Sequence, residues 1–130
     1  MPPTRLLSLS GALFGTILLA FGANYLLRPY AAYSTFGLPY VSHAADQEIV
    51  NSFCRLFGVK DVFVGVSLYT ATFFGSRRTL ATLLLAVGVA AMADGAIVKA
   101  HGEGDGGEWG HWGYGIVVTM LGGLGSLGVL

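Results

Sequence analysis

The chain has 130 residues, of which 54% are hydrophobic and 11% charged, against about 25% charged residues in ordinary soluble domains. Seven basic and seven acidic residues balance, so there is no basic patch for nucleic acid and no excess charge for another polyion. The single cysteine, Cys54, excludes an internal disulfide. A mean hydropathy of +0.67 indicates one integral membrane domain, residues 1–130, whose first partner is the lipid bilayer.

Four apolar runs follow one another along the chain, and each is long enough to be a transmembrane helix. Such a helix needs about 20 residues to cross about 30 Å of hydrocarbon. The runs are residues 6–27, 49–74, 79–98 and 109–130. The first is uncharged and the fourth carries only His111, so neither has the polar outer face of a soluble core helix. The sequence predicts an all-α fold, an up-down bundle of four transmembrane helices.

The first run could also be interpreted as a cleaved signal peptide, because the basic residue Arg5 precedes it. Its 22 residues are long for a signal core, however, and no small-x-small cleavage site follows cleanly. We therefore expect a retained helix. Gly11, Gly15 and Gly22 would give that helix a flat face on which a second helix can pack closely.

The loops have three different characters. Residues 28–48 are too apolar for a free linker, so we expect an interfacial segment with a short helix started by Pro29. Residues 75–78 form a tight turn, which makes the second and third helices antiparallel neighbours. Residues 101–108 form a glycine-rich, acidic loop.

Basic residues near the ends of the runs predict the orientation in the membrane. Arg5, Arg77 and Arg78 lie on one side, against Arg28 and Lys99 on the other. This modest bias favours both termini in the cytoplasm. We expect the endoplasmic reticulum or another endomembrane as the location.

Ionisable residues inside the runs are the candidates for function. Each costs about 2.5–3.5 kcal/mol in hydrocarbon and usually faces a bundle interior or a wet cavity. At 100° per residue, six small or polar residues of the second run share an arc of about 120°: Asn51, Arg55, Gly58, Asp61, Gly65 and Thr72. Lys60 lies off this arc, and its role stays open. In the third run, Asp94 shares a face with Val87, Ala90 and Ala91.

Arg55 and Asp94 lie at similar depths below the same membrane surface, so we expect them to pair. Around them we expect a polar pocket that opens to the non-cytoplasmic side, with Asp61 as its floor. Its other expected members are Asn24, Asn51, Tyr114, His101 and His111.

Two interpretations of this pocket remain open. In the structural one, Arg55 and Asp94 lock the pairing of two helices. In the functional one, Asp61, Asp94 and a histidine exchange protons with a bound apolar molecule, because a desolvated carboxylic acid is a usable general acid or base.

No other chemistry has a matching pattern in the sequence. His101, Asp105, Glu108 and His111 match no tight metal-ligand spacing, and we expect no metal site. No redox or nucleotide-binding motif is visible, so we expect no cofactor.

Two segments resemble a known family. The run from Phe53 to Gly65, and Asp94-Gly95-Ala96-Ile97-Val98 followed by His101-Gly102, are similar to a fungal family of small four-helix membrane proteins. That family is a domain of unknown function, similar in outline to the DoxX-like proteins. The resemblance covers residues 6–130 and carries over six positions: Arg55, Gly58, Asp61, Gly65, Asp94 and His101. Its members often occur near fungal secondary-metabolite genes, which implies a lipophilic small-molecule substrate.

We therefore expect an enzyme that binds an apolar small molecule and catalyses a cofactor-free proton transfer, such as an isomerisation, cyclisation or elimination. Asp61 and Asp94 would be the acid/base pair, and His101 would relay protons. Arg55 would hold a substrate oxygen, and Asn24, Asn51, Tyr114 and His111 would complete the binding site. The alternatives are a non-catalytic scaffold or assembly protein and a proton-coupled carrier, which at this size would work as a homo-oligomer.

Overall fold

A computed structural model describes residues 1–39, 41–102 and 106–130. Within these ranges the chain is helical and has no strand, which confirms the all-α prediction. The elements in chain order are α1 (Arg5–Leu27), α2 (Pro29–Tyr33), the 3-10 turn η1 (Ser34–Phe36), α3 (Ala44–Phe74), α4 (Arg77–His101) and α5 (Trp109–Ser126).

Local capping explains where the helices begin. The hydroxyl of Thr4 accepts a hydrogen bond from the Leu7 amide at 3.3 Å and starts α1. Ser76 does the same for the Thr79 amide at 3.1 Å, so α4 begins at residue 77 and not at the predicted 79. Likewise, α3 begins at residue 44 and not at 49. The predicted limits followed hydropathy, whereas a helix continues through polar turns at its ends.

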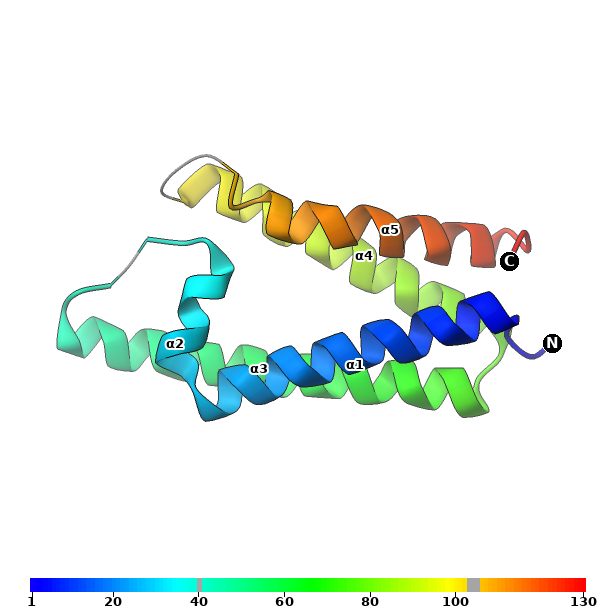
Figure 1. The fold of residues 1–130 in the computed structure, drawn as a ribbon, viewed down its shortest axis with the longest axis horizontal. Helices are drawn as coiled ribbons and strands as arrows, with labels where there is room; N and C mark the ends of the chain where they lie inside the picture. Colours follow the sequence, from blue (N-terminus) through cyan, green and yellow to red (C-terminus); the bar gives the residue numbers. More distant parts are fainter. Residues whose placement is uncertain (40, 103–105) are drawn as a thin grey trace.

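The four long helices alternate in direction and form two pairs, as Figure 1 shows. α1 packs along α3, and α4 packs along α5, while contacts between the pairs are few. The pairs converge at the end that holds the N-terminus and the α3–α4 turn, and they diverge toward α2. The buried core lies at the converging end, where Leu7, Leu68, Leu80 and Val118 are fully buried.

Glycine allows the close approach of α1 and α3. A Cβ added to Gly58 would lie 2.8 Å from the Gly22 carbonyl oxygen, and one added to Gly65 would lie 2.9 Å from the Gly15 carbonyl oxygen. The predicted glycine face of the first helix is therefore confirmed. Gly122 has the corresponding place between α5 and α4, where an added Cβ would lie 2.8 Å from the carbonyl oxygen of Ala81.

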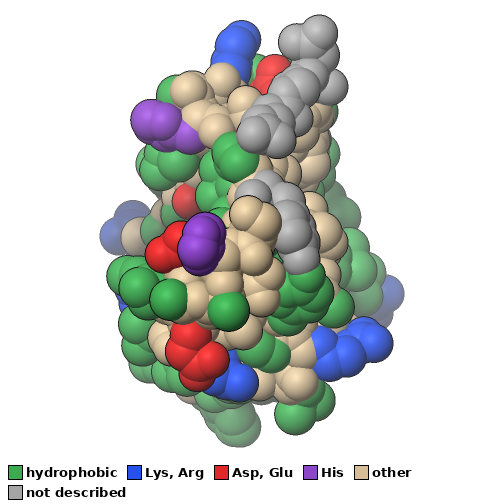
Figure 2. All heavy atoms as spheres, turned by 90° about the vertical axis from the view of Figure 1, so that its left-hand side faces the viewer, with side chains coloured by type: hydrophobic (Ala, Val, Ile, Leu, Met, Phe, Trp, Pro, Cys, Tyr) green, Lys and Arg blue, Asp and Glu red, His purple; other side chains and the backbone are tan. Residues whose placement is uncertain are grey.

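The segment after α1 bridges the two pairs at their open end. Pro29 starts the predicted short helix α2, which leads into η1. The Phe36 ring stacks on Tyr25 of α1, with ring centroids 4.9 Å apart, and meets Phe57 of α3 edge-on at 5.3 Å. Its carbonyl oxygen lies 3.4 Å from Nε2 of His111 on α5. Figure 2 looks onto this end, where acidic, basic and histidine side chains gather between apolar flanks.

The outer surface of the helices is apolar. Phe63 is 70% exposed, Leu9 69% and Met120 60%, and each points away from the core. Among the described residues, two helices, α1 and α4, are long and apolar enough to cross a membrane, with mean hydropathies of 1.9 and 2.0. α3 carries three charged residues in its apolar part, and α5 is rich in glycine.

Candidate functional site

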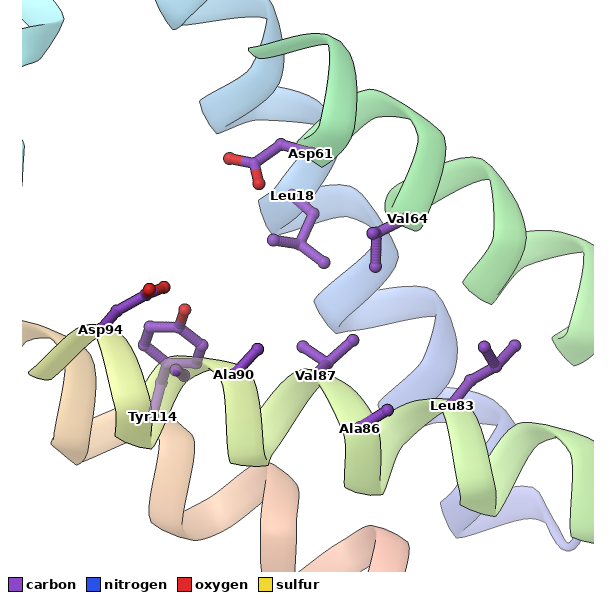
Figure 3. Close-up of a pocket in the computed structure, with 10 residues that line it drawn as sticks. Leu18, Asp61, Val64, Leu83, Ala86, Val87, Ala90, Asp94 and Tyr114 are labelled. Atoms are coloured by element: carbon purple, nitrogen blue, oxygen red, sulfur yellow. The ribbon is translucent and has the colours of Figure 1, made fainter. Parts of the chain in front are cut away.

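A cavity of about 240 Å³ lies between the two helix pairs (Figure 3). All four long helices contribute to its wall. Its polar lining residues are Asp61 of α3, Asp94 of α4 and Tyr114 of α5. The apolar lining residues are Leu18, Val64, Leu83, Ala86, Val87, Ala90 and Ala91. The divergence of the pairs creates this space, because facing side chains at this level no longer meet.

The two carboxyl groups approach the cavity from opposite pairs. In Figure 3, Asp61 extends from α3 and Asp94 from α4 into the space between these helices, and the Tyr114 hydroxyl lies near Asp94. All three side chains are half-buried. Both carboxylates lie within electrostatic reach of the Tyr114 phenol, and so does Tyr25 of α1. Three of the site residues that were expected from the sequence therefore line one cavity.

These polar groups have no protein partner within the part of the chain that the structure describes. Neither Asp61 nor Asp94 accepts a hydrogen bond or pairs with a cation there, and the Tyr114 hydroxyl is likewise unbonded. Unpaired carboxyl groups in an apolar setting are costly and occur mainly at functional sites. The cavity is thus equipped to bind a polar group or to move a proton.

The expected pairing of Arg55 with Asp94 is not formed. The Arg55 side chain is exposed, and it forms no ion pair with Asp94 or with any other described residue. The buried face of α3 is marked by Cys54, Gly58 and Gly65, whose mean direction lies about 80° from that of Arg55 at 3.6 residues per turn. The predicted arc contains the buried residues Gly58, Gly65 and Thr72, but it also included the exposed Arg55 at its edge.

The two histidines have different places. His101 is the last residue of α4, is exposed, and is not among the described lining residues of the cavity. His111 is half-buried on α5, near the Phe36 carbonyl oxygen, and interacts electrostatically with Asp94. His111 therefore interacts with a residue of the cavity wall.

The two asparagines lie away from the cavity wall that the structure describes. Asn24 accepts a hydrogen bond from Nη2 of Arg28 at 3.2 Å at the end of α1. Asn51 lies beneath α2, where it lines a cleft of about 10 Å³ with Tyr30. Lys60, for which the sequence suggested no role, extends outward with its amine 5.9 Å from the centre of the Phe57 ring.

The four residues considered as metal ligands, for which no metal site was expected, include Asp105, which lies outside the described residues. Among those that are described, no group of three or more His, Cys, Asp or Glu side chains is placed to hold a metal ion.

The apolar wall of the cavity was only partly foreseen. Val87, Ala90 and Ala91 share a face with Asp94, as expected. Leu83 lies on the same helical face one turn before Val87, so extending that face by one turn would have predicted it. Leu18 and Val64 carried no such signal, because apolar residues surround both in the sequence.

Comparison with known proteins gives one family. The model of a domain of unknown function, DUF4267, matches residues 15–125. The chain belongs to this family. No curated protein matches the chain, and no solved structure does. The DUF4267 match includes the cavity and both halves of the bundle, so the cavity is part of the family domain.

Proposed function

We propose that the protein is a multi-pass membrane protein in which all four long helices cross the bilayer and both termini are cytoplasmic. The support is the outer surface of the two helices that carry polar residues. Phe63 and Val66 of α3 are 70% and 52% exposed, and Ile116 and Met120 of α5 are 43% and 60% exposed. In water such a surface would drive aggregation, whereas in lipid it is satisfied. An endomembrane location fits this architecture.

Within that membrane domain, the proposed activity is a cofactor-free proton transfer on an apolar small molecule. The observation that carries it is the pair of unpartnered carboxyl groups, Asp61 and Asp94, facing one apolar cavity from opposite helix pairs. One carboxyl can donate a proton to the substrate while the other accepts one, as an isomerisation, cyclisation or elimination requires. The Tyr114 hydroxyl would hold a substrate oxygen, the role expected from the sequence for Arg55, because Tyr114 lines the cavity and Arg55 is not among its described lining residues.

Substrate access supports the same proposal. Ala86 and Ala90 of α4 line the cavity and are exposed, and we infer that the cavity opens sideways between α3 and α4. In a bilayer that side faces lipid, from which an apolar substrate would enter. His111, which interacts electrostatically with Asp94, is the proposed proton relay in place of His101. The proposal includes a role in fungal secondary metabolism and a similarity in outline to the DoxX-like proteins.

The experiment that tests the function is metabolite profiling of the source organism after deletion of the gene. Rescue is compared for the wild type, Asp61→Asn, Asp94→Asn and the control Asp46→Asn, whose carboxyl is exposed in the first turn of α3. We expect an apolar intermediate to accumulate and only the wild type and the control to clear it. Full clearance by both cavity variants would refute the acid/base proposal.

A second candidate function is a proton-coupled carrier. It is favoured by the packing of the chain into two tight helix pairs with few contacts between them, which would allow the pairs to rock. Uptake into proteoliposomes driven by a pH gradient separates this function from catalysis, because an enzyme would change its substrate without accumulating it. A scaffold remains the third alternative: the glycine contacts between α1 and α3 fit it, whereas the expected Arg55–Asp94 pair is not formed among the described residues.

A further inference from the structure

Asp61 and Asp94 bring two acidic side chains to the cavity, and His111 of α5, which interacts electrostatically with Asp94, is not among the described residues that line it. None of the described residues that line it is basic. Five of the seven basic residues lie near helix ends: Arg5, Arg28, Arg77, Arg78 and Lys99. The other two, Arg55 and Lys60, are exposed on the outer face of α3. A ligand that meets Asp61 and Asp94 therefore gains most if it brings a positive charge.

The third polar residue of the cavity favours the same ligand. The Tyr114 ring borders the space into which both carboxyl groups extend (Figure 3). An aromatic face attracts an organic cation through its quadrupole, by about 2 kcal/mol or more when the pair is desolvated. Carboxylates and an aromatic ring around one cavity are a suitable site for an ammonium group, alkylated or protonated.

The space beyond the carboxyl groups suits an apolar body. The cavity itself is smaller than the roughly 300–1,000 Å³ of a typical pocket for a drug-sized ligand, so it suits a head group. A second groove of about 460 Å³ continues along α3 and α4 and shares Leu83 with the cavity. Its lining includes Phe63, Val66 and Phe74, all of which are exposed on the outer surface.

We propose that the ligand is a lipophilic organic cation, an amine or quaternary ammonium compound. Its head lies between Asp61 and Asp94 against the Tyr114 ring, and its apolar body follows the groove between α3 and α4. The inference rests on the proposed function, since it names the substrate class of the same site. In lipid the apolar body gains little by leaving the bilayer, so the head group determines the selectivity.

The test uses the full chain in nanodiscs of zwitterionic phosphatidylcholine, which lack a charged lipid surface. Equilibrium dialysis measures the binding of radiolabelled dodecyltrimethylammonium and of its neutral carbon isostere, 2,2-dimethyltetradecane, with empty nanodiscs subtracted. We expect saturable binding of one cation per chain and no saturable binding of the isostere. Equal retention of the two compounds would overturn the proposal, because they differ only in charge.

Variants locate the site. Asp61→Asn and Asp94→Asn should each weaken cation binding at least tenfold, whereas Asp46→Asn should bind like the wild type. Asp94→Glu keeps the charge and should restore most of the affinity, which separates loss of charge from loss of fold. Binding to the wild type should also strengthen as the pH rises, because the probe keeps its charge while the carboxyl groups lose protons. Unchanged affinity in both asparagine variants would overturn the assignment.

The result of the cation-binding test can be distinguished from the result of the metabolite test of the proposed reaction. If the cation does not bind but Asp61→Asn still fails to clear the accumulated metabolite, the ligand class is wrong and the acid/base function stands. If the cation binds with the expected dependence on Asp61 and Asp94, while both variants clear the metabolite, the ligand class stands and the proposed reaction falls.

Discussion

Two adjacent glycines of α5 have different surroundings, so alanine substitutions at the two positions should have different effects on stability. An alanine at Gly122 would overlap the backbone nitrogen of Leu85 and place its Cβ 2.7 Å from Leu85 Cα and 2.8 Å from the Ala81 oxygen. Gly123 has no such neighbour among the described residues within 4 Å of an added Cβ. Because ordinary contacts begin at 3.4 Å, Gly122→Ala must push α5 away from α4.

The size of the effect follows from this comparison. Overpacking of this kind costs about 1–3 kcal/mol. Both substitutions gain up to about 1 kcal/mol of helix propensity, which cancels when the two variants are compared. Gly122→Ala should therefore be less stable than Gly123→Ala by about 1–3 kcal/mol. Equilibrium unfolding by sodium dodecyl sulfate in mixed micelles, followed by far-UV circular dichroism, measures the difference. Equal stability of the two variants would refute the close approach of α4 and α5.

Three further predictions concern the open end of the bundle and its orientation. Trp112→Phe removes the hydrogen bond from Trp112 Nε1 to the Met92 oxygen at 3.1 Å, and should cost about 0.5–1.5 kcal/mol in the same unfolding assay. Phe36→Ala removes the ring contacts to α1 and α3, so amide hydrogen exchange should quicken in residues 29–38 and stay unchanged in the glycine-packed part of α1. An N-glycosylation acceptor placed at Ser42 should be modified in microsomes, and acceptors added at the two termini should not. The reverse pattern would invert the proposed orientation.

The helical fold and its glycine contacts could be predicted from the sequence because their signals are local. The apolar runs predict helices, and the spacing of Gly11, Gly15 and Gly22 predicts a flat face. The packing of Gly15 on Gly65 and of Gly22 on Gly58 needs only that face and an antiparallel neighbour. The division into two pairs that diverge was not predictable, since no periodicity encodes the angle between pairs.

The contrast between local and non-local signals also explains which residues of the site could be predicted. Asp61 and Asp94 were predicted because ionisable groups in apolar helices usually face inward, and Tyr114 was predicted because it lies at a similar depth. The inward direction expected for Arg55 was wrong, because a helical arc predicts direction only to within about one residue position. A long arginine side chain can also extend outward to reach a polar phase. His101 shares the face of α4 that carries Asp94 but lies two turns beyond it, so it is not among the described residues that line the cavity.

The most direct measurement of the central claim uses deuterium. The metabolite that accumulates in the deletion strain is incubated in D₂O with the purified protein in nanodiscs, and its mass is followed. If Asp61 and Asp94 transfer protons to and from the substrate, the wild type and Asp46→Asn should incorporate deuterium at carbon, while Asp61→Asn and Asp94→Asn should not. Conversion without deuterium incorporation by the wild type, or equal incorporation by all four proteins, would contradict proton transfer by the two carboxyl groups.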